Sequence, residues 1–382
     1  MIKFILPITL LCSLSYAENF ETFLARAVEN SIYLQSSGLT IEQSRLEGNI
    51  IKRYENPKVE IEASSFESES GYRVAITQPI RLLDISADKE HFATSKERNA
   101  KVNVSAAHAQ FVKEMSLLYV EYSQKQKLLD LANEELKIAQ KINEISNQRF
   151  LSGSLSKALM LQADIDYATA QSNVLEHERE HSLSHYDLLA FAGVTEELQI
   201  EPNYQFGLIN DEKENPDIAL LESENAMSIS ESKLNTYAIE SIEVFGEYER
   251  EGNQNIYRAG VSIALPFFND KSEEKSILSL QERRNALALK AYKNRLQTKI
   301  TTLKKELDTL NRLLQKRQSN LKNEQELMDM YNDAYAIATI NILELYEIKN
   351  RLLSTKREVI NLQSQISRTT IDYNYTQGNY NE

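Results

Sequence analysis

The stretch LQTKITTLKKELDTLNRLL at residues 296–314 is the strongest indication of how this chain folds. Its apolar residues recur at alternating steps of four and three: Leu296, Ile300, Leu303, Leu307, Leu310 and Leu314. This heptad spacing predicts the apolar seam of a coiled coil. The stretch lies within 111 residues, between Pro266 and Gly378, that contain neither glycine nor proline. We therefore expect very long helices, since a helix of about 65 residues extends roughly 100 Å.

The composition of the whole chain supports this expectation. Among 382 residues only 10 are glycine and 6 are proline, so few turns are available. A second run without either residue, 80–152, carries its own heptad seam of Leu128, Leu131, Ile138, Ile142 and Ile145. The net charge of −13 argues against nucleic acid as a partner.

The N-terminus has the pattern of a secretory signal peptide. Residues 1–17, MIKFILPITLLCSLSYA, contain one lysine, an apolar run and small residues before the expected cleavage after Ala17. Lipoprotein processing at Cys12, the one cysteine, is the alternative, although Leu11 stands where a small residue is preferred. Either route predicts export to the cell envelope.

Two regions follow a two-residue period and predict β-hairpins. Apolar and polar residues alternate in four segments: 59–64, 72–77, 242–248 and 257–267. We expect one hairpin at 57–80, with Gly71 in its turn, and a second at 240–268, with Gly252 and Asn253 in its turn. Strands of about ten residues match the length of a tilted strand that spans a bilayer.

The two halves of the chain follow the same plan. Pro79 and Pro266, which close the two hairpins, are 187 residues apart, and the helix breaks at 150–155 and 335–340 are 185 apart. This offset predicts a duplicated unit of helix, hairpin, long helix and returning helix. The expected divisions are a first repeat at 18–193, a connector at 194–215 and a second repeat at 216–382.

Four such strands cannot close a membrane structure alone. Unpaired backbone groups at both sheet edges would face hydrocarbon, at several kcal/mol each, and the smallest membrane barrels have eight strands. We therefore expect an oligomeric pore that continues into a tube of helices, a mixed α+β membrane protein. The positions assigned to a polar, water-filled lumen are Glu60, Glu62, Arg73, Glu243, Glu247 and Arg258.

This plan resembles the TolC-like outer-membrane efflux family over residues 20–378. The segments that carry the resemblance are FLARAVENSIYLQ (23–35), Asn56-Pro57, ITQPI (76–80), RFLSGSLSKALM (149–160), IALPFF (263–268) and AYAIATINILELYE (334–347). The resemblance implies a homotrimer with a twelve-stranded barrel in the lipid of the outer membrane and a helical barrel across the periplasm. It also implies two partners, a periplasmic adaptor protein and an inner-membrane pump of the resistance-nodulation-division type.

The same resemblance assigns roles to the two helix breaks. They would form the periplasmic tips that contact the adaptor, at Gly153, Ser154, Leu155, Ala338, Thr339 and Ile340. Ala338 departs from the family, which favours glycine there. Glu344 and Glu347 match positions that line the periplasmic aperture, and a solvated acidic helix face is the alternative.

Three histidines form the only other pattern that suggests a site. His177, His181 and His185 are spaced four apart, and histidine pairs at that spacing can chelate a transition metal. Without a cysteine nearby, a hydrated or interhelical histidine stripe is the favoured interpretation. No nucleotide-binding or nucleophile motif is present, so we expect neither an enzyme nor a cofactor.

The sequence thus leaves three functions to compare. The first is the exit duct of a tripartite pump that exports small molecules or metal cations. The second is the outer-membrane duct of a type I protein secretion system. The third is a periplasmic coiled-coil scaffold, which would have no use for four strands of bilayer length.

Overall fold

The computed structural model describes residues 17–65, 70–195, 198–209, 211, 213–337 and 339–380. Cys12 and the rest of the expected signal peptide before Ala17 lie outside these residues, as does Ala338. The chain divides into two compact units. The first unit combines residues 1–32, 109–213 and 298–382, and the second combines 33–108 and 214–297. Each unit therefore draws on both of the expected repeats, whose boundaries stay a prediction.

Seven helices account for most of the described chain. They are α1 (Phe20–Asn30), α2 (Ile32–Lys52), α3 (Leu83–Leu151), α4 (Lys157–Ala192), α5 (Pro216–Leu234), α6 (Ser272–Ala336) and α7 (Ile342–Thr376). With 69 and 65 residues, α3 and α6 confirm the very long helices that the scarcity of glycine and proline predicts. None of the helices in the described residues is both long enough and apolar enough to cross a membrane.

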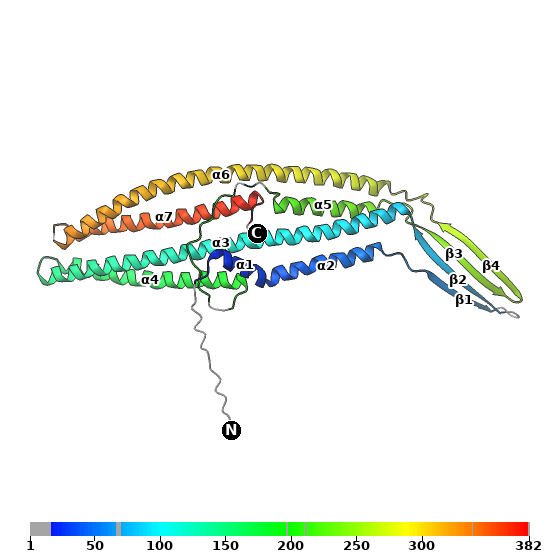
Figure 1. Ribbon diagram of the computed structural model, residues 1–382, viewed down its shortest axis with the longest axis horizontal. Coiled ribbons are helices and arrows are strands. Elements are labelled where there is room, and N and C mark those ends of the chain that lie inside the picture. Colours follow the sequence, from blue (N-terminus) through cyan, green and yellow to red (C-terminus); the bar gives the residue numbers. More distant parts are fainter. Residues whose placement is uncertain are drawn as a thin grey trace, which may run out of the picture. The chain divides into compact units, whose positions relative to one another are not determined.

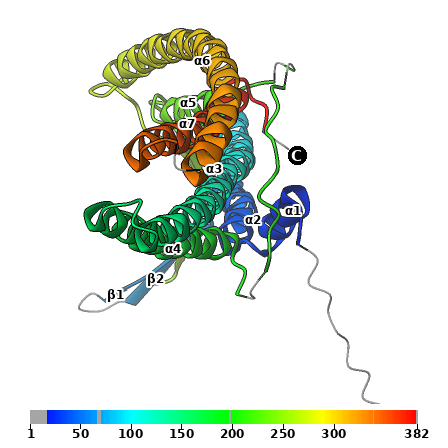
Figure 2. The ribbon, with the colours of Figure 1, turned by 90° about the vertical axis from the view of Figure 1, so that its left-hand side faces the viewer.

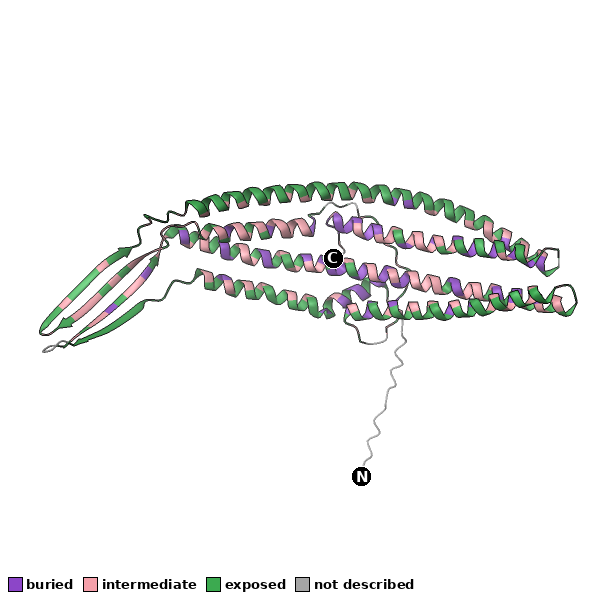
Figure 3. Ribbon diagram, turned by 180° about the vertical axis from the view of Figure 1, so that it is seen from behind, coloured by how far each residue is buried: buried purple, intermediate pink, exposed green. Residues whose placement is uncertain are grey.

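In the first unit, α3 pairs with α4 and α6 pairs with α7 as two helical hairpins (Figures 1 and 2). Both heptad seams face inward: Leu307 and Leu310 of α6, and Leu131 and Ile142 of α3, are buried. Most of the remaining surface of α6 is exposed, as Figure 3 shows. The heptad pattern therefore predicted the seams correctly.

In the second unit, the strands form one antiparallel sheet in the order β1-β2-β3-β4 (Figure 1). The strands are β1 (Lys58–Ser65), β2 (Ser70–Arg81), β3 (Ser241–Glu251) and β4 (Gln254–Ile263). The first hairpin pairs with the second through β2 and β3, for example Ala75 with Glu247. β1 and β4 are therefore the two edges of the sheet.

Two details of the expected hairpins are wrong. Gly71 lies inside β2 rather than in a turn, and a Cβ atom there would come within 2.8 Å of the Arg250 carbonyl oxygen. The glycine thus permits close approach of the neighbouring strand. The second hairpin ends at Ile263, which pairs with Ile242, rather than at residue 268; β3 begins only one residue earlier, at Ser241, so it has no partners for residues 265–268.

Candidate pore-lining sheet face and helix tips

The strand register sorts the side chains of the sheet into two faces. Paired residues lie on the same side, and neighbours along a strand point to opposite sides. Glu60 pairs with Ala75, Ala75 with Glu247, and Glu247 with Arg258. Following every pair in this way places all six residues expected in the lumen on one face, which we call the charged face. Its ionisable members are Lys58, Glu60, Glu62, Arg73, Arg81, Glu243, Glu247, Glu249, Glu251 and Arg258.

Two arginines link most of these carboxylates into one network. Arg73 lies 3.7 Å from Glu60, 3.2 Å from Glu62 and 3.2 Å from Glu247. Arg258 contacts Glu247 and also pairs with Glu249 at 2.5 Å. The network therefore spans all four strands. Six glutamates against four basic residues leave this face with an excess of two negative charges.

The opposite face, which we call the apolar face, is exposed in the single chain. Nine large apolar side chains on it are exposed: Val59, Ile61, Tyr72, Ile76, Ile80, Val244, Tyr257, Val261 and Ile263. Soluble proteins rarely expose a contiguous apolar patch of this kind. Apolar-out and polar-in alternation along strands is the pattern of a transmembrane barrel wall.

The helix breaks form two loops in the first unit. Gly153, Ser154 and Leu155 lie between α3 and α4, with Gly153 at φ 77°, the left-handed conformation that glycine adopts most easily. Thr339 and Ile340 lie between α6 and α7. Ser156 and Asn341 begin the returning helices as N-caps, each accepting a backbone N–H bond.

Glu344 and Glu347 lie in the first turns of α7, and both are exposed. Glu347 pairs with Arg351 at 3.3 Å along the same helix, and its side chain is 76% exposed. Such exposure fits either a ring of carboxylates at an aperture or a solvated helix face. The two glutamates therefore lie within two turns of the loop that joins α6 to α7.

A buried cluster beneath the loops was missed by the sequence reasoning. Tyr335, at the end of α6, is fully buried, and its hydroxyl lies 2.7 Å from Ser146 Oγ of α3. The guanidinium group of Arg149 lies 4.8 Å from the centre of the Tyr335 ring. These contacts fasten the ends of α3 and α6 together. Around them pack Ile142, Ala163, Met328, Ile342, Leu345, Ile348 and Leu352.

One ion pair lies inside this cluster. Lys349 of α7 is 1% exposed, and its Nζ atom donates to both carboxylate oxygens of Asp166 in α4, at 2.6 and 2.7 Å. Tyr346 lies beside it, and burial, together with the Asp166 charge, raises the pKa of its hydroxyl. A signal for the buried lysine, though not for its partner, was present in the sequence. Lys349 continues the three-and-four spacing of Ile342, Leu345 and Leu352, so a lysine occupies a seam position.

The three histidines pack as a stripe. The rings of His181 and His185 are nearly parallel, with centres 6.3 Å apart, and Tyr122 of α3 lies 5.2 Å from the first and 5.3 Å from the second. His185 Nε2 lies 2.8 Å from the Leu198 carbonyl oxygen, and His177 lies 3.5 Å from Glu180. Within the described residues, no group of three His, Cys, Asp or Glu side chains is arranged to hold a metal ion.

Long paired helices joined to a four-stranded sheet define the fold of the TolC-like outer-membrane channels, and solved structures confirm it. CusC aligns with a TM-score of 0.78 at 15% identity, over 94% of this chain and 92% of that one. VceC of Vibrio cholerae aligns with a TM-score of 0.78 at 14% identity, over 95% and 96% of the two chains. MtrE of Neisseria gonorrhoeae aligns with a TM-score of 0.76 at 13% identity, over 94% and 88%.

VceC is described as an outer membrane protein and MtrE as an outer membrane channel. No family model matches this sequence, and no curated protein matches it significantly. The likeness to channels therefore stands on the fold, which extends over nearly the whole length of the chain.

Proposed function

We propose that this protein is the outer-membrane exit duct of a tripartite efflux pump. The observation that carries the proposal is the sheet, which has one exposed apolar face, one charged face and two edges. A helical scaffold in water would gain nothing from such a sheet. The similarity of the fold to outer-membrane channels supports the same conclusion.

The sheet edges support assembly into a ring. β1 and β4 would each leave a row of backbone groups facing hydrocarbon unless another copy pairs with them. Three copies would supply twelve strands, with the apolar face toward outer-membrane lipid and the charged face toward a lumen. The order of helix, hairpin, long helix and returning helix, met twice along the chain, supports a duplicated unit within each copy.

The excess of negative charge on the charged face supports a cation-preferring pore. A narrow lumen with more carboxylates than basic groups attracts cations, and salt screens this attraction over about 10 Å at 0.1 M. The cargo would be a small molecule or a metal cation. The duct itself would be a passive, non-enzymatic conduit, and the energy would come from an inner-membrane pump of the resistance-nodulation-division type.

The helix tips are the proposed contact with the periplasmic adaptor. Gly153, Ser154 and Leu155 on one loop, with Thr339 and Ile340 on the other, interrupt helices that are otherwise continuous. Glu344 and Glu347 follow the second loop directly, so in a ring they would gather six carboxylates near the entrance. We assign these two residues to the aperture.

Planar-bilayer recording of the purified protein, with crosslinking in detergent, tests the function. We expect a crosslinked trimer and cation-selective pores, with a reversal potential under a salt gradient that moves toward zero in the Glu344→Gln, Glu347→Gln double variant. The matched control is Glu176→Gln, Glu178→Gln on exposed positions of α4, which should leave the potential unchanged. A stable monomer without pores would overturn the exit duct, whereas an unchanged potential in the first variant would overturn only the aperture assignment.

A further inference from the structure

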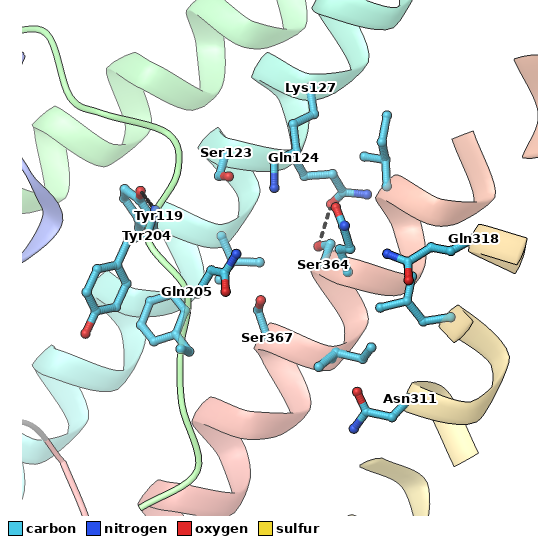
Figure 4. Close-up of a pocket in the computed structure, with 16 residues that line it drawn as sticks. Tyr119, Ser123, Gln124, Lys127, Tyr204, Gln205, Asn311, Gln318, Ser364 and Ser367 are labelled. Atoms are coloured by element: carbon cyan, nitrogen blue, oxygen red, sulfur yellow. Dashed lines mark hydrogen bonds between the residues drawn. The ribbon is translucent and has the colours of Figure 1, made fainter. Parts of the chain in front are cut away.

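A cavity of about 320 Å³ lies in the first unit, away from the loops and the aperture residues. Helices α3, α6 and α7 form its walls with the connector at residues 204–206 (Figure 4). Gln124, Gln205, Ser364 and Ser367 point into the space, and Gln318 faces them from α6. The volume lies near the lower end of the roughly 300–1,000 Å³ range of small-molecule pockets.

The polar groups of this cavity fall into two sets. Those that shape the walls are hydrogen-bonded: Ser364 Oγ donates to Gln124 Oε1 at 2.9 Å, and Tyr119 accepts from the Tyr204 backbone N–H at 2.9 Å. The second set has no protein partner among the described residues: Lys127, Gln205, Gln318, Gln363 and Ser367. Side-chain amides and hydroxyls both donate and accept, so this second set is suited to a ligand with several hydroxyl groups.

The charge of the cavity is the reverse of the charge of the chain. In a protein with a net charge of −13, none of the lining residues is Asp or Glu, and the one charged side chain is Lys127. No ion pair joins Lys127 to any described residue. Burial lowers the pKa of its ammonium group, so a bound anion would stabilise the charged form. The lining therefore disfavours metal cations and amines and favours one negative group.

Aromatic side chains supply an apolar wall. Tyr204 and Phe206 line the cavity with their ring centres 5.0 Å apart, and both contact the ring of Phe20 behind them. Burial raises the pKa of the neighbouring Tyr119 hydroxyl to about 12, so this wall stays neutral at physiological pH. These contacts hold the rings in place before any ligand arrives.

We propose that this cavity binds a pyranose sugar that carries a carboxylate. The free amides and the Ser367 hydroxyl would pair with the sugar hydroxyls, the aromatic wall would cover the apolar C–H face of the ring, and Lys127 would pair with the carboxylate. Two sources share this chemistry: a free sugar acid, and the acidic amino sugar of a periplasmic glycan.

Saturation-transfer NMR on the full-length protein in lauryldimethylamine oxide tests the site, since a maltoside detergent would present a competing sugar. The probes are glucuronate, N-acetylmuramate and glucose, the last as a neutral reference. We expect both acids to bind more tightly than glucose, and the tighter of the two identifies the source. Lys127→Gln should weaken the binding of glucuronate about tenfold, which corresponds to the loss of one charge-assisted hydrogen bond, and should leave the binding of glucose unchanged.

Two further variants make the result decisive. Lys141→Gln, on an exposed position of the same helix, removes the same charge and should bind glucuronate as the wild type does. Ser367→Phe should fill the cavity and abolish binding of all three sugars, while far-UV circular dichroism and size-exclusion chromatography confirm an intact fold. Absence of saturation transfer from both acids to the wild type, equal affinity for glucuronate and glucose, or equal losses in the two lysine variants would each overturn the proposal. The assay requires no transport, so its outcome is independent of the proposed exit-duct function.

Discussion

The charged face of the sheet and the buried cluster beneath the helix loops both depend on ion pairs, yet in opposite settings. On the sheet, Arg73 contacts Glu60, Glu62 and Glu247. The side chains of Glu60 and Glu62 are 59% and 64% exposed. In the cluster, Lys349 is almost completely buried and has a single partner, Asp166. Water screens the first arrangement, whereas in the second it reaches only part of the Asp166 side chain.

Under the proposed function, this difference separates charges that would act on solutes from charges that hold the fold. An exposed network with surplus carboxylates contributes little to stability, but in a lumen it would attract cations. A buried pair is costly to break, because the remaining charge has lost its water. Ion pairs are therefore expected to serve different purposes in the two units.

The largest effect is expected from Lys349→Met, which leaves Asp166 without its partner. Because Asp166 keeps partial access to water, we expect a loss of roughly 2–4 kcal/mol in the free energy of unfolding. Urea unfolding followed by circular dichroism measures it. The control is Arg351→Met, which breaks the exposed pair with Glu347 and should cost less than about 1 kcal/mol. Equal losses in the two variants would remove the distinction between the two settings.

A smaller loss is expected from Tyr335→Phe, which keeps the ring beneath Arg149 and removes only the hydroxyl that contacts Ser146. We expect the free energy of unfolding to fall by about 1 kcal/mol, the net contribution of a typical hydrogen bond. A double-mutant cycle with Ser146→Ala isolates the interaction. Strictly additive losses would show that the bond between the ends of α3 and α6 contributes nothing.

On the charged face, Arg73→Gln should change stability by less than about 1 kcal/mol and should act on ion preference instead. Removing this cation would leave more uncompensated carboxylates in the proposed lumen, so the reversal potential should shift toward stronger cation selectivity. Arg250→Gln, on the apolar side of the same sheet, is the matched control. A large loss of stability in Arg73→Gln with no change in selectivity would make the network structural.

The smallest effect is expected at His181, whose setting lies between the two extremes. Burial and the neighbouring His185 lower its pKa below the ordinary 6.5, while Asp130 acts in the other direction. The unfolded chain then binds more protons than the folded one as pH falls through about 6.5, so stability should decrease from pH 7.5 to 5.5. The groups around it are His177, His185, Tyr122, Lys125, Asp130 and Glu180.

His181→Gln should reduce this decrease, and melting temperatures at the two pH values measure it. The control is His91→Gln, at an exposed position of α3, which should leave the decrease unchanged. A steeper decrease in His181→Gln would contradict the sign of the pKa shift.

The sequence predicted the elements of the fold well because two periods dominate it. Heptad spacing located the seams of α3 and α6, and two-residue alternation located all four strands and assigned six residues to one face of the sheet. The sequence was a less reliable guide where the end of an element depends on the neighbouring element. The last strand was predicted too long, because its end at Ile263 depends on where β3 begins.

The buried cluster and the cavity were not predicted, for a related reason. Lys349 and Asp166 are 183 residues apart, so only the packing of α4 against α7 reveals them as partners. The cavity is formed by three helices and a connector, and no local pattern marks residues such as Gln205 or Gln318 as neighbours. Periodicity reports which side of an element is buried, not which element covers it.

The two unlike edges of the sheet have a consequence for cells that make both intact and damaged copies of this chain. In the proposed ring, β4 of one copy would meet β1 of the next, so each copy would depend on both neighbours, and the contact would be head-to-tail rather than self-complementary. A single copy with a damaged edge would therefore disable the whole ring that contains it. In a ring of three, equal expression of intact and edge-damaged chains would leave only about one ring in eight fully intact. Damage to one gene copy would thus act dominantly over an undamaged one.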